Sequence, residues 1–371
     1  MGIYIAILLW LIIIGMISLQ TKSKFIQEKS ILIFYVFFIF IYACRSQSVG
    51  FDYSVYRNVY NLFEKYGMAA MKSGYSFTME KGYLMINWLF TSMHIDIHVF
   101  QALIAIGIVW FINKFIIMEK DSMLLTVFFL YTLGFFFNAM NQIRSLFAAA
   151  MCLYAISVAL NKKYKKAIVL IMLACTLHVS VIISFVFIFI IWRNIKINAK
   201  NVILSSGLCV TVIVLWNSVL GVFLKLFPKY TIYFSEDKAG EFIKSGNITY
   251  LLLFVCIFAF AIYKRPSIIE QGNEMKIKRY DTLLWMTIFG MCISIIVLKL
   301  SMVQRFIILP LFSSSMLIAM AIKSERNGKN RLIWLIFISC ALCAYMYIYL
   351  NVAQDGLGRD GVVPYKFYWN K

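Results

Sequence analysis

Three side chains that can carry positive charge interrupt apolar stretches of this sequence. Arg144 opens an alanine-rich stretch, His178 lies in the middle of another, and Arg305 opens a third. Charge at membrane depth is costly, so such residues are candidates for function, although an arginine at a helix end also anchors to lipid headgroups. Two guanidinium groups that face one cavity fit a diphosphate, which arginine grips through paired hydrogen bonds.

The candidates for proton transfer are His178 and two carboxylates, Glu80 and Asp52. An imidazole with a pKa near neutrality can act as a general base, and a lone histidine among apolar residues can equally be a satisfied core group. Glu80 precedes a short apolar segment, where partial burial would raise its pKa or where it would pair with Arg144. Asp52 follows a glycine turn, where it could orient a sugar hydroxyl or the histidine.

Neutral and aromatic residues accompany these groups. Asn141 and Gln142 lie beside Arg144 and could donate hydrogen bonds to the same diphosphate. Tyr53 and Tyr56 belong to an amphipathic segment after residue 50, and Lys366 is surrounded by aromatic residues in the C-terminal tail. Aromatic rings suit both sugar stacking and anchoring at the membrane interface, so these three are candidate substrate contacts.

The elements that must position these residues are membrane helices. Of 371 residues, 62% are apolar and 14% are charged, and the apolar runs recur along the whole chain. A soluble core could not hide them, so we predict an all-α, polytopic membrane protein. The net charge of +20 comes from short basic clusters between the runs, which indicates topology rather than nucleic-acid binding. The eight cysteines lie in or beside apolar segments, and we expect no disulfide, no metal site and no cofactor.

About ten runs are long enough to cross a bilayer, where a helix needs about 20 residues. Two segments are irregular: residues 81–93 are too short to cross and are expected to be re-entrant, and residues 165–192 carry polar residues in the middle and are expected to form a broken helical hairpin. The expected full spans are 2–19, 31–44, 97–113, 122–138, 144–160, 201–220, 249–263, 281–298, 305–322 and 331–350.

The basic residues set the expected orientation. Six short connections hold 21 of the 36 Lys and Arg residues and are placed in the cytoplasm, because cytoplasmic loops carry the excess of these residues. Both termini then lie outside. We expect a single transmembrane domain, residues 1–371, whose extracytoplasmic parts are the loops 45–96 and 221–248 and the tail 351–371.

Five motifs in chain order resemble the EpsG/Wzy-type family of bacterial polysaccharide polymerases. The resemblance covers nearly the whole chain, and it departs at Ser145, where the family commonly has a Gln directly after the Arg. The motifs are Gly50-x-Asp52-Tyr53-x-x-Tyr56, Glu80-x-Gly82-Tyr83 with Asn87, Asn141-x-x-Arg144, Leu177-His178-x-Ser180 and Pro364-Tyr-Lys-Phe-x-Trp369.

The resemblance implies transfer of a growing glycan from undecaprenyl diphosphate to a lipid-linked repeat unit, at the outer face of the bacterial plasma membrane. The implied partners are that lipid-linked oligosaccharide, the bilayer, and a flippase and a chain-length regulator of the same pathway. Two other functions fit many spans and a buried histidine. These are a flippase or transporter for lipid-linked oligosaccharides, which would show pseudo-symmetry between halves, and a membrane O-acyltransferase. The sugar and the linkage do not follow from the sequence.

Overall fold

The computed structural model describes residues 1–21, 23–72, 79–215, 218, 221–222, 224–225, 248–298, 301–351 and 360–369. The expected loop 221–248 lies almost wholly outside these residues, as does the glycine-rich part of the tail, 352–359. Across the described residues the secondary structure is helical, and the β-type pairing they contain is one isolated bridge between Arg45 and Phe367. The expected all-α class is confirmed.

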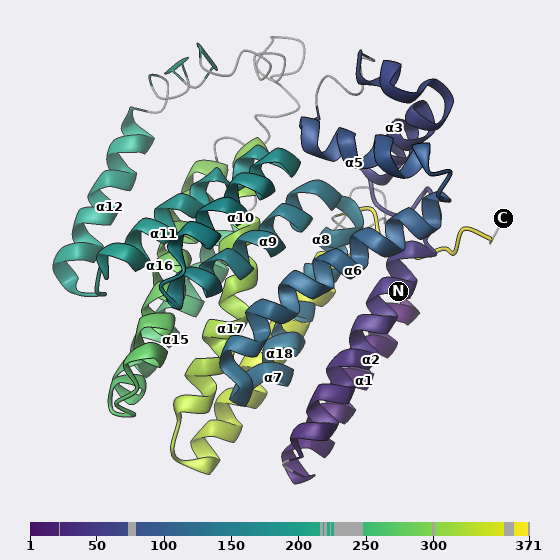
Figure 1. The fold of residues 1–371 in the computed structure, drawn as a ribbon. Coiled ribbons are helices and arrows are strands. Elements are labelled where there is room, and N and C mark those ends of the chain that lie inside the picture. Colours follow the sequence, from purple (N-terminus) through teal and green to yellow (C-terminus); the bar gives the residue numbers. More distant parts are fainter. Residues whose placement is uncertain are drawn as a thin grey trace.

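The helices form one bundle (Figure 1). In chain order they are α1 (Gly2–Thr21), α2 (Lys24–Ala43), α3 (Tyr53–Tyr66), η1 (Gly67–Lys72), α5 (Lys81–Ser92), α6 (Ile97–Ile116), η2 (Ile117–Ser122), α7 (Met123–Thr132), α8 (Phe135–Asn141), α9 (Ile143–Leu160), α10 (Tyr164–Leu177), η3 (Val179–Ile183), α11 (Ser184–Arg193), α12 (Ala199–Val214), α15 (Thr249–Ile269), α16 (Glu274–Val297), η5 (Ser301–Ile307), α17 (Ile308–Ser324) and α18 (Gly328–Asn351).

Seven helical segments among the described residues are long and apolar enough to cross a membrane. They include α2, α9 and α15 to α18; residues 97–132 make up the remaining segment, which is kinked at Glu119, where φ is −123° and ψ is 76°. The expected span 122–138 is divided, because Gly134 has a positive φ of 91° and separates α7 from α8. The expected span 201–220 lies partly outside the described residues. The chain is therefore a multi-pass membrane protein, and the number of crossings stays a prediction.

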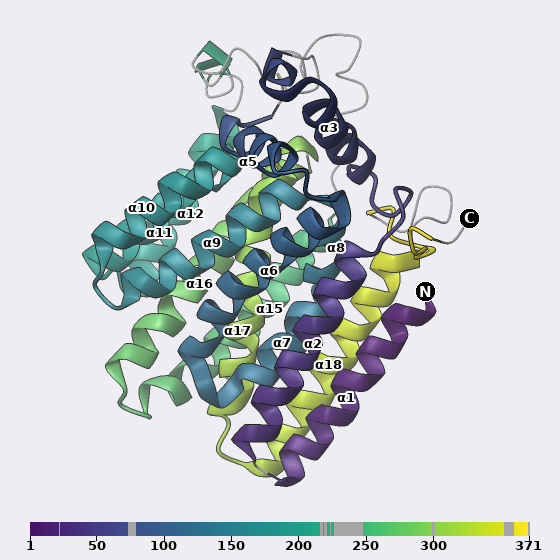
Figure 2. The same cartoon turned by 45° about the vertical axis from the view of Figure 1, so that its right-hand side comes forward.

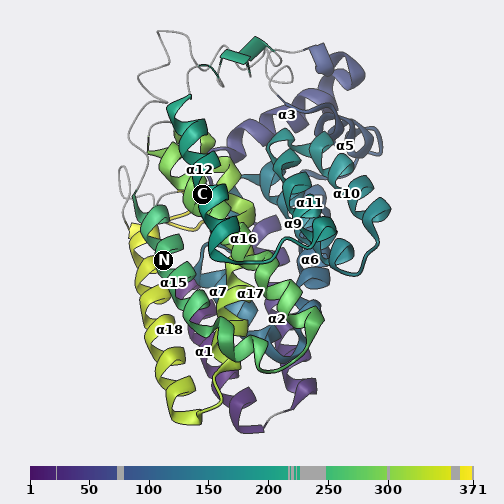
Figure 3. The ribbon, with the colours of Figure 1, turned by 90° about the vertical axis from the view of Figure 1, so that its left-hand side faces the viewer.

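The helices differ in how much of their apolar surface the protein covers. α9 and α17 lie at the centre of the bundle, and most of their residues are buried. On α18, by contrast, Ile333 and Phe337 are 63% and 65% exposed. Apolar surface of this kind is stable only against lipid tails, so α15 and α18 form part of the lipid-facing periphery. Figure 3 shows both helices at the outside of the bundle.

The connections separate into two ends. In Figures 1 and 2 the turns joining α1 to α2, α15 to α16 and α17 to α18 lie at the bottom, whereas α3 and α5 lie at the top. The start of α1 and residues 360–369 lie toward the top as well. The basic connections thus share one end of the bundle. Which side of the membrane each end faces stays a prediction from the positive-inside rule.

The expected broken hairpin is present. α10 stops at Leu177, His178 is extended, and the chain continues through η3 into α11. Tyr164 and Ile191, from the two ends of the hairpin, line the same cavity at the bottom of the bundle. Figure 3 shows α9, α10 and α11 side by side. The short segment expected to be re-entrant forms α5, a helix of 12 residues.

Candidate active site

An antiparallel pair of helices brings Arg144 and His178 together. α9 begins at Ile143, and a tight turn at residues 161–163 joins its end to the start of α10. α10 then runs back along α9 and ends at Leu177. The first turn of α9 therefore lies beside the last turn of α10. The polar Thr176-Leu-His178 run ends α10, because His178 leaves helical geometry with φ −158° and ψ 118°. Its side chain consequently projects from an irregular stretch rather than from a helix.

A close helix contact brings Glu80 to the same place. Glu80 is the N-cap residue of α5, and Gly82 lies in its first turn against α10. A Cβ atom at Gly82 would lie 2.4 Å from Thr176 Oγ1 and 2.6 Å from the Thr176 carbonyl oxygen. Only glycine fits this approach, since real Cβ atoms do not come within 3.0 Å of other heavy atoms. Gly82 thus allows α5 to rest on the end of α10.

Glu80, Arg144 and His178 form a buried cluster, which we call the Glu80 cluster. One carboxylate oxygen of Glu80 accepts a hydrogen bond from the Arg144 guanidinium, forming an ion pair. The other lies 3.2 Å from His178 Nδ1 and 3.2 Å from the Val179 backbone nitrogen, which donates to it. The three side chains are only 9%, 11% and 7% exposed. A single carboxylate therefore joins residues that are 64 and 98 positions away in sequence.

Electrostatics keep Glu80 ionised. Burial alone would raise its pKa, but the hydrogen bond with His178 and the charge of Arg144 outweigh burial and lower the pKa to about 2. A carboxylate with so low a pKa is a weak base. It can orient the imidazole from the Nδ1 side, and both ring nitrogens of His178 are buried without a hydrogen bond in the part of the chain that the structure describes. Because Nδ1 lies next to Glu80, Nε2 is the candidate atom for proton transfer.

Two tyrosine rings enclose the Arg144 guanidinium. The guanidinium carbon lies 5.6 Å from the ring centre of Tyr56 and 5.8 Å from that of Tyr83, within the range of cation–π attraction. The two rings meet edge to face at 5.7 Å. Arg144 Nε has no hydrogen-bond partner among the described residues, so the guanidinium keeps donor capacity. The sequence predicted Tyr56 as a substrate contact. It gave Tyr83 only as a member of the Glu80-x-Gly82-Tyr83 motif.

Asp52 and Arg305 act on the Glu80 cluster at longer range. Burial raises the pKa of Asp52, and the charges of Arg305 and Arg144 oppose that shift. The charge of Arg305 also acts on His178. Asp52 precedes α3, and its carboxylate makes no capping hydrogen bond to that helix. Both residues therefore lie in the electrostatic range of the cluster, as the sequence predicted, without a direct ion pair between them.

The C-terminal tail fixes the turn that carries Asp52. Asn141 Oδ1 accepts a hydrogen bond of 2.8 Å from the Asp52 backbone nitrogen, and Asn141 Nδ2 donates to Asp360 at 3.0 Å. Tyr349 also donates to Asp360. The Gly50 nitrogen donates to the Gly361 carbonyl oxygen at 2.8 Å. The carboxamide of Asn141 is thus engaged by protein groups, and it positions Asp52 rather than standing free for a diphosphate.

The remaining predicted residues lie outside the cluster. Tyr53 is fully buried and packs on the guanidinium of Arg45, 3.9 Å from its ring centre. Gln142 caps α9 and accepts from the Ser145 hydroxyl. Lys366 is exposed, and its carbonyl oxygen accepts from the Ser46 nitrogen at 2.8 Å. Arg45, which sequence analysis missed, is fully buried and donates to Gln101 at 3.2 Å, so it ties the start of the loop after α2 to α6.

The described residues hold no group of three or more His, Cys, Asp or Glu side chains that could bind a metal ion. The cationic side chains at this site are Arg144, with its free donor capacity, and Arg305 nearby. The arrangement combines a buried imidazole nitrogen, an ionised carboxylate that orients it, and two guanidinium groups. It can bind a polyanionic leaving group and accept a proton beside it.

Comparison with known proteins places the chain in one family. A search of curated proteins and a search of solved structures each returned no match. The family model described as the EpsG family matches residues 29–367, which includes the Glu80 cluster, Asp52, Arg305 and the start of the tail. Since the match covers nearly the whole chain, this protein belongs to the EpsG family.

Proposed function

We propose that this protein transfers a growing glycan from undecaprenyl diphosphate to a lipid-linked repeat unit at the outer face of the plasma membrane. Its membership of the EpsG family supports a polysaccharide polymerase-type role in general. The observation that carries the finer assignment is the Glu80 cluster, in which a buried base candidate, His178, lies next to an arginine with unused donors. Glycosyl transfer from a diphosphate needs both groups side by side.

The proposed reaction forms one bond and breaks one. A hydroxyl oxygen of the acceptor sugar attacks the anomeric carbon of the growing glycan, and the bond from that carbon to the diphosphate oxygen breaks. The diphosphate leaves with the bonding electron pair, so its negative charge increases. Arg144 and Arg305 stabilise that charge. The hydroxyl proton passes to His178 Nε2, whose Nδ1 is oriented by Glu80.

Asp52 is the second candidate for the base. Its pKa is raised by burial, so its affinity for a proton exceeds that of an exposed aspartate. Glu80, which the sequence placed among the candidate bases, is better suited to orient His178 because its pKa is lowered to about 2. The two tyrosine rings beside Arg144 offer an apolar and aromatic wall for a sugar or for the isoprenoid carrier.

The charge distribution supports an outward-facing site. The Glu80 cluster lies at the end of the bundle that carries α3 and α5, away from the turns that join α15 to α16 and α17 to α18 (Figure 2). Those turns include basic residues such as Arg265, Lys276 and Lys329. Under the positive-inside rule they are cytoplasmic, which puts the cluster on the outer side.

The test uses purified protein and undecaprenyl diphosphate-linked repeat units. A ladder of longer lipid-linked glycans, with release of undecaprenyl diphosphate, is the expected product. In cells that lack the protein, single repeat units should accumulate on the surface carrier. Loss of all surface glycan would favour a flippase, and full-length chains that lack an acyl substituent would favour an acyltransferase; either result would refute the proposal.

A further inference from the structure

A second polar cavity lies at the bottom end of the bundle, far from the Glu80 cluster. It has a volume of about 910 Å³ and lies among the ends of α9, α10, α11, α15 and α16. Leu160, at the last turn of α9, lines it, and Arg144 belongs to the first turn of the same helix. A rise of 1.5 Å per residue puts these two residues about 24 Å apart. The cavity is therefore a separate site.

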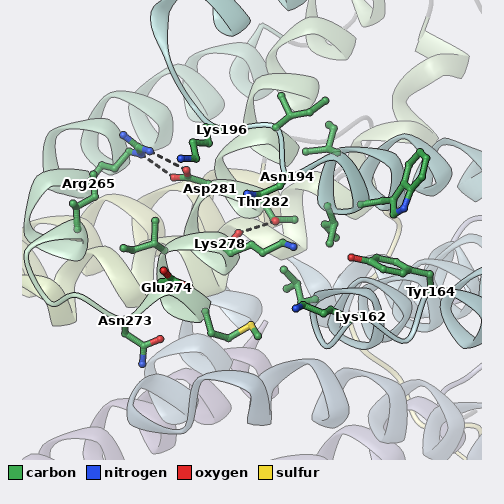
Figure 4. Close-up of a pocket in the computed structure, with 18 residues that line it drawn as sticks. Lys162, Tyr164, Asn194, Lys196, Arg265, Asn273, Glu274, Lys278, Asp281 and Thr282 are labelled. Atoms are coloured by element: carbon green, nitrogen blue, oxygen red, sulfur yellow. Dashed lines mark hydrogen bonds and ion pairs between the residues drawn. The ribbon is translucent and has the colours of Figure 1, made fainter.

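Four of the residues that line this cavity are basic, among mostly neutral and apolar neighbours. Figure 4 shows Lys162, Lys196, Lys278 and Arg265 around it, together with two carboxylates, Asp281 and Glu274. One carboxylate is neutralised within the wall. Arg265 holds Asp281 through two parallel hydrogen bonds of 2.8 Å, from Nε and from Nη2. Glu274, which is exposed, is the one carboxylate left without an ion pair among the described lining residues.

The three lysines have no carboxylate partner. No Asp or Glu oxygen in the described part of the chain lies within ion-pairing distance of Lys162, Lys196 or Lys278. Lys162 is close enough for its positive charge to act on Lys278. Lys162 and Lys196 are exposed and Lys278 is half-buried, so water solvates much of their charge, and an anion held between Lys162 and Lys278 would offset the repulsion between those two. The residues come from three separate connections, after α9, after α11 and at the start of α16.

The remaining lining adds neutral polar groups and an apolar rim. Asn194, Thr282 and Tyr164 supply amide and hydroxyl groups to the wall (Figure 4). Trp192 and Ile269 also line the cavity, and they are 59% and 43% exposed on the lipid-facing surface. A polar, basic interior beside an exposed apolar rim matches a ligand with a charged head and an acyl tail.

We propose that this cavity binds a phosphate group through Lys162 and Lys278, with Lys196 on another part of the wall (Figure 4). Phosphate oxygens accept hydrogen bonds from several ammonium groups at once, and basic pockets between membrane helices recognise phosphate headgroups. The phosphate can belong to an anionic lipid, as the apolar rim favours, or to a soluble phosphorylated compound. The site does not depend on the proposed polymerase activity, because it lies at the other end of the bundle.

The experiment measures the thermal stability of the purified protein against two probes. Inorganic diphosphate is titrated in neutral detergent, with sodium chloride at matched ionic strength as the reference. Separately, the protein is reconstituted in nanodiscs that contain phosphatidylcholine alone or with increasing phosphatidylglycerol. Each series compares wild type with K162Q/K278Q and with K329Q. Lys329 is an exposed lysine in the first turn of α18, outside the cavity.

We expect a saturable rise in melting temperature for wild type and K329Q, and an apparent affinity at least ~10-fold weaker for K162Q/K278Q. A lysine near the membrane surface contributes about 1 kcal/mol to phosphate binding, or roughly fivefold, so two should exceed tenfold. Because diphosphate also fits the Glu80 cluster, a response to diphosphate that weakens in K162Q/K278Q would identify a soluble phosphate as the ligand, and a response to phosphatidylglycerol alone that weakens in this variant would identify a lipid headgroup. No response to either probe, or equal responses in both variants, would overturn the proposal. K162R/K278R keeps both charges and should bind as wild type, which separates charge loss from misfolding.

Discussion

Replacing Glu80 with Gln removes one charge from the buried cluster while keeping the size and shape of the side chain. The carboxylate of Glu80 is only 9% exposed and serves Arg144, His178 and the Val179 nitrogen together. In the variant, Arg144 stays buried without a counter-charge and the imidazole loses its acceptor. We expect a lower free energy of unfolding and a fall in turnover of at least ~100-fold, because His178 is no longer oriented.

Two independent estimates give the size of the stability loss. The pKa of Glu80 falls from 4.5 to about 2 on folding, which corresponds to about 3 kcal/mol of stabilisation above pH 4.5. Removing one partner of a buried ion pair typically costs about 3–5 kcal/mol. Because the pKa is lowered in the folded state, this stabilisation is complete above pH 4.5 and is lost as the pH falls toward 2. The stability difference between wild type and Glu80→Gln should therefore shrink over that range.

The assay is thermal denaturation of both proteins in detergent between pH 7 and pH 3, beside turnover at pH 7. Glu64→Gln is the matched control, since Glu64 is exposed on α3. A double-mutant cycle with Arg144→Gln should give a coupling free energy of about 1–3 kcal/mol. Additive losses, or a stability difference that is the same at pH 7 and pH 3, would refute the reasoning about Glu80.

Three other predictions follow from the same geometry. Arg144→Lys should reduce turnover at least ~10-fold without loss of folded protein in size-exclusion chromatography, because an ammonium group cannot reproduce the paired hydrogen bonds of the guanidinium. Gly82→Ala should lower both melting temperature and turnover, since its Cβ would lie 2.4 Å from Thr176 Oγ1; Gly15→Ala, with nothing within 4 Å, should change neither. A cysteine at Ser48 should react with an impermeant thiol reagent added to intact cells above the wild-type background, whereas one at Asn327 should not, and the reverse pattern would invert the topology.

Hydropathy and local polarity predicted much of the fold. The break in the hairpin was foreseen because polar Thr176, His178 and Ser180 interrupt an apolar run, and α10 indeed ends at Leu177. The break at Gly134 was not foreseen, since the flanking residues are apolar throughout and a positive φ is not visible in composition. Hydropathy indicates whether a segment lies in lipid or in water. It does not predict a change of backbone conformation inside a segment that is apolar throughout.

Some of the residues predicted for the site lie together in the structure, among them Glu80, Arg144 and His178, and their role in catalysis stays a prediction. A pairing of Glu80 with Arg144 was one of two expectations, and the structure favours it over a raised pKa for Glu80. The role of Asn141 was not foreseen, because Asp360 reaches it from the C-terminal tail. Contacts of that kind arise from the packing of distant segments. Arg45 was missed for the same reason: its partners are two tyrosine rings and Gln101, and no nearby charge marks it in sequence.

The most direct test of the central claim compares His178→Gln with wild type, using purified protein and lipid-linked repeat units. Gln keeps polar atoms near Glu80 and loses the titratable nitrogen that corresponds to Nε2, which has no hydrogen-bond partner among the described residues. Turnover and melting temperature are measured on the same samples. We predict a fall in turnover of at least ~100-fold with repeat-unit binding retained. Turnover near that of wild type, with only a lower melting temperature, would contradict a catalytic role for His178 and leave Asp52 as the candidate base.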